Sequence, residues 1–547
     1  MALGKFIWVS LLRLTNGNFR AGLFLNGVIL GTLALIMILG AQRLRGSASY
    51  SDAFFPLALL NLGQWRIWVF SAHIVHIIPA VLVFTLLSIL VRSQGQLTLG
   101  RAALAGVCLV LLPLGSATGL PFVLALALWL GYSGVLHWLS PELHNKRIGI
   151  VTLGLTFAAL LMLAFYFVGY QRIPGCPPSP GLGALLATSV HFLTMSLGPV
   201  TASFWEFSAA GVLGFLLVSG GLLIVGWRRR PHERLRALGL LLFMGAMASL
   251  ALGVGLGRSG CPESTAFSPH YVLLAVPALC CAYFIWGIYG TQSSSRLVQM
   301  SLFTVMCMMF PLNAQGALDA GREYRDQMSA FERDLRGGTP AFVLAERYSR
   351  FLYPYEFRGF WVGRPDESPE YNEYLALWLQ MLKHAGIGQF KLLQDEPTLR
   401  EVPLAVVPTA LDQMTWSKGI GYTFGRNPSL TFTLKAPQLV YAIRLKYSYG
   451  PTTDASFQMF WKNTGRNDFD TAERNVQLKL QHWQTYPPTG PGEKTLTVWV
   501  NDTIDQFRIQ PDTQPGVFRI SQIVLLVPIA DGHVSPARET RLPERHL

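Results

Sequence analysis

A single carboxylate, Asp52, stands among serine, aromatic and proline residues in the stretch RLRGSASYSDAFFPLALLNLGQWRIW, residues 43–68. A positioned carboxylate can take a proton from a hydroxyl group and so act as a general base. Aspartate is also a favoured helix N-cap, and Asp52 stands directly before the apolar run AFFPLALL. Both interpretations, a catalytic base and a helix cap, remain open on the sequence alone.

Two histidines form a second candidate. His73 and His76 in the motif HIVH are three residues apart, which places both on one face of a helix. Two imidazoles could ligate a metal ion, but no third ligand and no Cys-x-x-Cys or Cys/His cluster accompanies them. We therefore predict packing at the membrane interface and no metal site. The sequence also lacks a P-loop, a glycine-rich dinucleotide motif and a Ser-His-Asp signature.

Composition identifies the setting of these residues. The chain has 547 residues, of which 51% are hydrophobic and only 14% charged, against about 25% charged in a soluble domain. The net charge of +13 fits basic cytoplasmic loops better than nucleic-acid binding, because Lys and Arg accumulate on the cytoplasmic side of membrane proteins. We predict a multi-pass membrane protein whose first partner is the lipid bilayer, with no nucleic acid.

Residues 1–313 contain nearly all the long apolar runs and are predicted to form a polytopic α-helical membrane domain. A spanning helix needs about 20 mostly apolar residues. About nine candidate spans follow: 21–42, 71–91, 102–120, 121–139, 148–170, 206–227, 237–257, 270–290 and 297–313. Residues 184–198 and the run FFPLALLNLGQWRIWVF could instead dip into the membrane or lie along its surface. No convincing cleavage site precedes the first span, so we expect an uncleaved anchor.

Basic loop residues orient this domain. Lys5, Arg13 and Arg20 precede the first span and predict an N-terminus on the cytoplasmic side. Alternation over nine spans then places the basic loops around Arg92, Lys146 and Arg228 inside, and the C-terminal domain and Asp52 outside. In a bacterium this means the inner membrane, with the C-terminal domain periplasmic or extracellular.

Two of the six cysteines test that orientation. Cys176 and Cys261 fall in loops that the charge pattern places outside, where an oxidising compartment would let them form a disulfide. Two free thiols are the alternative. The other cysteines lie within predicted spans and are expected to pack as small apolar residues.

Residues 314–547 have the composition of a water-soluble domain. Helical spacing in 314–398 predicts a membrane-proximal helical connector. Residues 399–547 contain short alternating runs, such as QLVYAIRLKYSYG, separated by Asn, Asp, Gly and Pro. They predict an antiparallel β-sandwich of the jelly-roll type.

Two resemblances follow from these residues. The strands YAIRLKYSY, FQMFWKN, VQLKLQHW, TLTVWV and FRISQIVLL look like jelly-roll domains similar to carbohydrate-binding modules. The membrane part, with YSDAFFPL after the first span, SATGLPF between two spans and GRSG…SPHY before a late span, resembles GT-C-type glycosyltransferases. That resemblance implies an enzyme that transfers a sugar from a polyprenyl-phosphate carrier to an envelope polysaccharide at the outer face. It requires no further cofactor and does not determine metal dependence or oligomeric state.

The resemblance also implies roles for individual residues. Asp52 occupies the first outer loop, where the family places its catalytic acid, although no second acid stands beside it. Arg258, His270 and Arg66, together with Arg43 and Arg45, could face the lipid phosphate, and interfacial snorkelling is the alternative for Arg258. Trp461, Trp483 and Trp499 could stack on sugar rings, whereas packing in the core or on a strand face is the alternative for Trp461 and Trp499.

A second function class competes with the enzyme. In it the protein is a non-catalytic envelope protein whose membrane bundle anchors a glycan-binding or protein-binding β-sandwich. A transporter fits less well, because the predicted spans contain almost no charged residues and show no inverted repeat.

Overall fold

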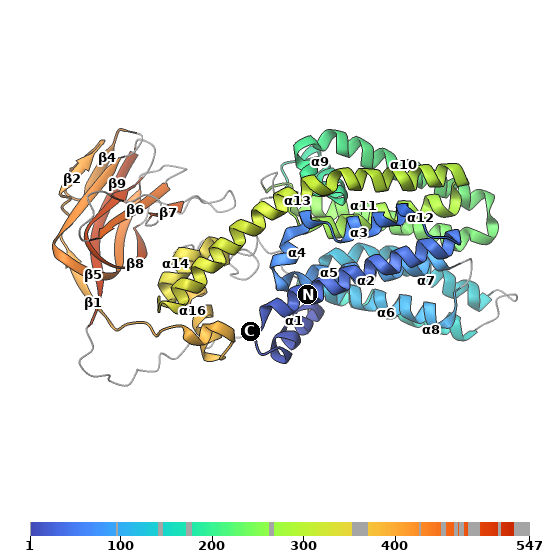
Figure 1. Ribbon diagram of the computed structural model, residues 1–547, viewed down its shortest axis with the longest axis horizontal. Coiled ribbons are helices and arrows are strands. Elements are labelled where there is room, and N and C mark those ends of the chain that lie inside the picture. Colours follow the sequence, from blue (N-terminus) through green and yellow to red (C-terminus); the bar gives the residue numbers. More distant parts are fainter. Residues whose placement is uncertain are drawn as a thin grey trace. The chain divides into compact units, whose positions relative to one another are not determined.

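The computed structural model describes residues 2–93, 97–139, 146–170, 178–261, 267–352, 370–425, 428–449, 456–463, 469, 475–479, 493–511 and 516–529. The chain divides into two units, Met1–Met328 and Ser329–Leu547. The first is a helical bundle, and the second combines short helices with an antiparallel sheet (Figure 1). This confirms the fold class predicted from the sequence.

Eight helices of the described chain are long and apolar enough to cross a membrane. They are α2 (Phe19–Arg45), α5 (Ile74–Arg92), α7 (Leu120–Leu139), α8 (Lys146–Tyr166), α10 (Trp205–Arg229), α11 (Arg234–Arg258), α12 (Tyr271–Tyr289) and α13 (Gln292–Arg336). Each corresponds to a predicted span, and the remaining prediction, 102–120, corresponds to the shorter apolar helix α6 (Leu99–Gly115). The protein is therefore a multi-pass membrane protein.

Polar contacts identify one end of this bundle. Arg45, in the last turn of α2, donates to the side chain of Gln299 near the start of α13 (3.3 Å). Arg236, at the start of α11, donates to the carbonyl of Val91 at the end of α5 (3.2 Å). We call this the arginine-rich end. Its basic residues are Arg43, Arg45, Arg92, Arg101, Lys146, Arg147, Arg228, Arg229, Arg230, Arg234, Arg236 and Arg296.

The opposite end, called here the histidine end, holds both the first helix and the exit of the chain. Trp8 of α1 (Ala2–Leu14) donates to the hydroxyl of Ser71 (3.1 Å), immediately before α5. The neighbouring Phe70 contacts Tyr324 of α13, with ring centroids 5.1 Å apart. The N-terminal helix and the last part of the bundle before the second unit therefore lie at the same end.

The segment between α2 and α5 passes back from one end to the other. At the arginine-rich end Asp52 is paired with Arg45. At the histidine end the carbonyl of Ile67 accepts from Asn26, in the first turns of α2 (3.2 Å). The chain between them consists of η1 (Tyr50–Ala53), α3 (Phe54–Leu59), η2 (Leu62–Gln64) and α4 (Trp65–Val69). On the sequence alone this stretch could dip into the membrane or lie along its surface; in the structure its two ends lie at opposite ends of the bundle.

The passage between α2 and α5 is a series of short helices and not one continuous helix. Buried amide side chains satisfy backbone groups where these helices break. Gln64 donates to the carbonyl of Leu59, and the side-chain oxygen of Asn61 accepts from the backbone amide of Gly63 (2.8 Å). Backbone groups that leave the helical pattern inside a membrane must find such partners, because no water is available. Asn61 and Gln64 are fully buried. These polar residues also lower the local hydropathy, which is why a search for apolar runs missed the passage.

A second interrupted segment stays at the histidine end. It contains α9 (Leu182–Thr194), η6 (Met195–Leu197) and η7 (Pro199–Phe204). Asn313 of α13 holds it by donating to the carbonyl of Leu197 (2.9 Å) and accepting from the amide of Val200 (3.2 Å). Gly198 between them has a φ of +108°, and a Cβ there would collide with the Asn313 side chain. The predicted dip of residues 184–198 thus describes this segment better than a full crossing.

The second unit is built on one nine-stranded antiparallel sheet. Its strands are β1 (Leu399–Leu404), β2 (Ala410–Asp412), β3 (Met414–Ser417), β4 (Ile420–Thr423), β5 (Ser429–Tyr449), β6 (Ser456–Asn463), β7 (Asn475–Lys479), β8 (Lys494–Gln510) and β9 (Gly516–Pro528). The main order is β3-β4-β9-β5-β8-β6-β7. Helices α14 (Ala341–Leu352) and α16 (Glu370–His384) and the turn η10 (Gly388–Leu392) precede the sheet.

The long strand β5 shows how the sheet forms a sandwich-like core. Ile443, Leu445 and Tyr447 alternate toward one buried cluster, as their period of two predicts. A bulge between Val440 and Ala442 shifts this alternation and leaves Ala442 in a second, smaller cluster. The sheet thereby buries residues on both faces.

Glu396 links the helices to the sheet. Its carboxylate accepts from the hydroxyl of Tyr441 on β5 and from the backbone amide of Phe342 on α14 (3.2 Å). Burial raises the pKa of Glu396 above its ordinary value. The folded protein therefore holds this proton more tightly than the unfolded chain does, and this group's contribution to stability is lost as the pH rises through its folded pKa.

We expect Glu396→Gln to remove that pH dependence, because the amide keeps an acceptor but has no titratable charge. Glu396→Ala should lower the local stability by about 1–3 kcal/mol at every pH, since it leaves buried donors unsatisfied. Hydrogen exchange of the β5 amides in the full-length protein, measured from pH 5 to 8, reports both effects. A pH slope that is the same in wild type and Glu396→Gln would contradict the assignment.

Candidate functional site

Asp52 lies at the arginine-rich end with its carboxylate oxygens engaged. Oδ2 accepts from Arg45 (2.6 Å) and from the backbone amide of Ser49 (3.1 Å), while Oδ1 accepts from the hydroxyl of Tyr283 (2.8 Å). Ser49 and Asp52 form a capping box at the start of η1, so Asp52 is the third residue of this short helix and not its N-cap. The residue is only 3% exposed.

This geometry is that of a structural ion pair. The carboxylate joins α2 and η1 to α12 through Tyr283, and Tyr283 in turn stacks on Phe54 at 5.5 Å between ring centroids. Asp52 lies at the same end of the bundle as Arg92, Lys146 and Arg228. The charge pattern of the sequence predicts these basic residues on the opposite side of the membrane from Asp52. The expectation that Asp52 lies in an outer loop, opposite these basic residues, is therefore corrected. The difference arises because the prediction did not count the segment between α2 and α5 as a passage through the bundle.

Three histidines meet at the histidine end. His73 of η3 (Ser71–His73) and His76 of α5 stack on each other at 5.3 Å between ring centroids. His270, immediately before α12, lies 4.9 Å from His76 and 5.7 Å from His73. The i, i+3 spacing of the first two was visible in the sequence. The third comes from a segment almost two hundred residues later, so no local pattern could add it.

Two arginines predicted to bind phosphate lie next to these rings. Arg66 of α4 approaches the hydroxyl of Ser268 (3.5 Å), and that hydroxyl is 3.0 Å from Nδ1 of His270. Arg258, in the last turn of α11, is close enough to act electrostatically on His76 and His270. The structure thus brings together Arg66, Arg258 and His270 of the residues predicted to face phosphate, whereas Arg43 and Arg45 lie at the arginine-rich end. We call them, with His73 and His76, the His–Arg cluster.

The chemistry of the cluster favours an anion over a metal ion. The imidazole rings lie nearly parallel, with interplanar angles of 24° to 30°, so their nitrogens do not converge as metal ligands do. Within the described residues no group of His, Cys, Asp or Glu could hold a metal ion. Burial and the neighbouring histidines and arginines lower the pKa of His270, so the positive charge at neutral pH resides on the arginines.

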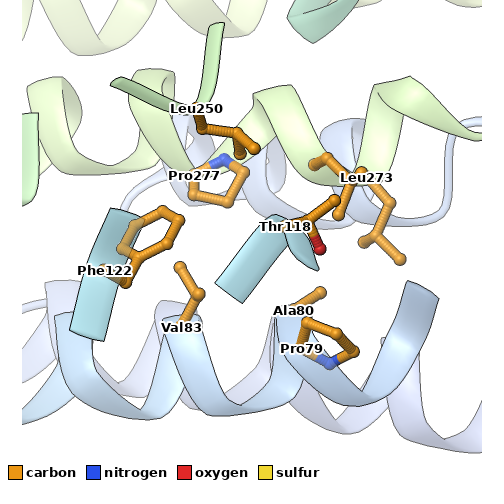
Figure 2. A pocket seen from close by; sticks show the side chains of 9 residues that line it. Pro79, Ala80, Val83, Thr118, Phe122, Leu250, Leu273 and Pro277 are labelled. Atoms are coloured by element: carbon orange, nitrogen blue, oxygen red, sulfur yellow. The ribbon is translucent and has the colours of Figure 1, made fainter. Parts of the chain in front are cut away.

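A small apolar cavity lies one helical turn deeper in the bundle (Figure 2). Its wall includes Pro79, three residues after His76, and Leu273, three residues after His270. The other lining residues are Ala80, Val83, Thr118, Phe122, Leu250, Leu274 and Pro277. Because this wall is almost wholly apolar, a charged ligand group would remain at the level of the His–Arg cluster.

The predicted sugar-stacking residues lie in different settings. Trp461 is 6% exposed and belongs to the main core of the sheet, which matches the core-packing alternative and leaves no open ring face. Trp483 lies outside the described residues. Trp499 of β8 stacks on Phe342 of α14 at 4.4 Å between ring centroids.

Three of the four cysteines in predicted spans are packed in the bundle as expected, whereas Cys307 is exposed. Cys108, Cys280, Cys281 and Cys307 are free, and the first three are buried. Cys261, in the loop after α11, is disulfide-bonded. Its predicted partner, Cys176, lies outside the described residues, so the pairing of the two stays a prediction.

No protein-family model matches this chain, and no curated protein matches it either. The likeness to GT-C-type glycosyltransferases therefore rests on the arrangement of motifs in the sequence alone.

Proposed function

We propose that this protein binds a phosphate-bearing lipid, of the polyprenyl-phosphate-sugar class, through the His–Arg cluster at the non-cytoplasmic face of a bacterial inner membrane. In this proposal it is a GT-C-like glycosyltransferase or a degenerate relative of one, acting on an envelope glycan. The observation that carries the proposal is the convergence of Arg66, Arg258 and His270 from three distant segments.

The distribution of basic residues supports this sidedness. At the arginine-rich end α5 ends and α6 begins, α7 ends and α8 begins, and α10 ends and α11 begins, and basic residues flank each of these junctions. The histidine end has fewer basic residues, among them Lys5, Arg13 and Arg20. The positive-inside rule then assigns the arginine-rich end to the cytoplasm. In this proposal the N-terminal helix, the His–Arg cluster and the exit of α13 lie on the other side.

The site has the charge that a phosphate leaving group requires. Guanidinium groups bind phosphate oxygens in a bidentate way, and fixed cations stabilise the charge that develops on a departing phosphate. The apolar surroundings strengthen this attraction, since the effective dielectric constant there is low. A lipid carrier would leave its isoprenoid chain in the bilayer and present only its phosphate to the cluster.

Sugar transfer needs, in addition, a base for the acceptor hydroxyl. Asp52 does not supply it, because it lies at the other end of the bundle. The loop that joins Arg258 to His270 has one acidic residue in the sequence, Glu263, which lies outside the described residues. The alternative function, a non-catalytic anchor for the C-terminal sheet, would need the lipid site but no base.

Labelling of single introduced cysteines tests the sidedness directly. We expect a membrane-impermeant maleimide to reach Arg13→Cys and Val407→Cys in intact cells whose outer membrane has been permeabilised. Ala48→Cys, on the exposed turn after α2, should react only after the inner membrane is opened. The parent protein, without an added cysteine, provides the background. Labelling of Arg13→Cys and Val407→Cys from opposite sides would restore the nine-span topology and overturn the proposal.

A further inference from the structure

A second group of arginines lies at the arginine-rich end, far along α5 from the His–Arg cluster. Arg92 ends α5, and Arg101 lies in the first turn of α6. Arg43, near the end of α2, and Arg101 both act electrostatically on Arg92. These three side chains are here called the arginine triad.

A hydrogen bond fixes two members of the triad relative to each other. Arg101 donates to the carbonyl of Arg92 (2.9 Å), and this bond joins the end of α5 to the start of α6. Thr98 caps α6 by accepting from the amide of Arg101 (3.4 Å). The remaining amides of that first turn form the positive end of the helix dipole, which favours an anion beside them.

No carboxylate balances this charge within the described chain. None of the ion pairs between described residues involves Arg43, Arg92 or Arg101. The nearby Asp52 is already engaged by Arg45. The loop residues 94–96 are Gln, Gly and Gln in the sequence, so they add no acid. The Nε of Arg92 is buried and has no hydrogen-bond partner among the described residues.

Like charges close to one another disfavour each other's charged form, and an anion among them relieves this repulsion. We propose that the arginine triad is a binding site for the phosphate of an anionic phospholipid. The triad lies where α2 and α5 end and α6 begins, which is the level of lipid head groups, and basic pockets between helix ends on the cytoplasmic side bind such lipids. This site is separate from the His–Arg cluster and does not depend on the proposed function.

The test uses the full-length protein in mixed micelles that contain either phosphatidylglycerol or phosphatidylcholine. We expect phosphatidylglycerol, but not phosphatidylcholine or inorganic phosphate, to raise the melting temperature of the wild type and to remain bound in native mass spectra. Replacing all three residues, Arg43→Gln with Arg92→Gln and Arg101→Gln, should weaken this binding on the order of fivefold per arginine. The single variant Arg92→Gln, which leaves the Arg101 backbone contact intact, serves if the triple variant does not fold.

The matched control removes the same charge elsewhere at this end. Arg228→Gln, Arg229→Gln and Arg234→Gln are exposed positions, and their combined variant should keep most of the lipid binding. An equal loss in the control would show a diffuse basic surface and overturn the site. Equal stabilisation by inorganic phosphate would overturn the assignment to a lipid.

Discussion

Replacing Asp52 by alanine should lower the free energy of unfolding of the membrane unit by about 3 kcal/mol, because it leaves a partly buried charge without its partner. The side chain of Arg45 is 23% exposed and that of Asp52 only 5%, so water cannot replace the lost contact fully. The substitution also leaves the hydroxyl of Tyr283 and the amide of Ser49 without their acceptor. Thermal unfolding of the purified protein in detergent measures the effect.

The variant series separates the structural role from a catalytic one. Asp52→Asn should be intermediate, since an amide oxygen can still accept a hydrogen bond but carries no charge. The double variant Asp52→Ala with Arg45→Met should be destabilised by less than the sum of the single changes, because the unpaired cation is removed as well. Asp319→Ala, at an exposed ion pair on α13, should have almost no effect. A wild-type melting temperature for Asp52→Ala would contradict this role.

The helices of the bundle were predictable because apolar length alone identifies them. Spans such as 237–257 and 270–290 differ from α11 and α12 by a few residues only. The segment 46–70 escaped because Pro56, Asn61 and Gln64 interrupt its apolar run, and its crossing depends on amide contacts that no periodicity encodes. When this one passage is left out of the count, every loop after it is predicted on the wrong side of the membrane relative to the N-terminus.

The sites show the same division between local and distant information. Arg66, Arg258 and His270 could be proposed from residue type and from their nearness to predicted span ends. That these residues meet, and that His73 and His76 join them, depends on packing between α4, α5, α11 and α12. The sequence of its strand could not decide whether Trp461 is buried or exposed. Alternation with a period of two shows which residues share a face of the sheet, but both faces of this sheet bury side chains.

Removal of either arginine of the His–Arg cluster should have the largest functional effect. We expect Arg66→Gln and Arg258→Gln each to weaken binding of a short-chain polyprenyl phosphate by about tenfold or more, because a hydrogen bond to a charged group contributes about 1.5–3 kcal/mol. The retained lipid is measured in detergent with the purified full-length protein. Arg228→Gln, an exposed arginine at the opposite end, is the matched control and should bind as the wild type does.

Turnover distinguishes the enzyme from the anchor. If the protein transfers sugar, Glu263→Gln should lower the rate by about 100-fold to 10,000-fold, the range typical of a lost general base, while lipid binding stays unchanged. Asp52→Asn, assayed at a temperature where it is folded, should retain the wild-type rate because it lies at the other end of the bundle. A normal rate in Glu263→Gln would exclude this residue as the base, and loss of turnover in folded Asp52→Asn would contradict the placement of the reaction at the histidine end.

Wild-type lipid binding by both Arg66→Gln and Arg258→Gln would contradict the proposal that the His–Arg cluster is the phosphate site.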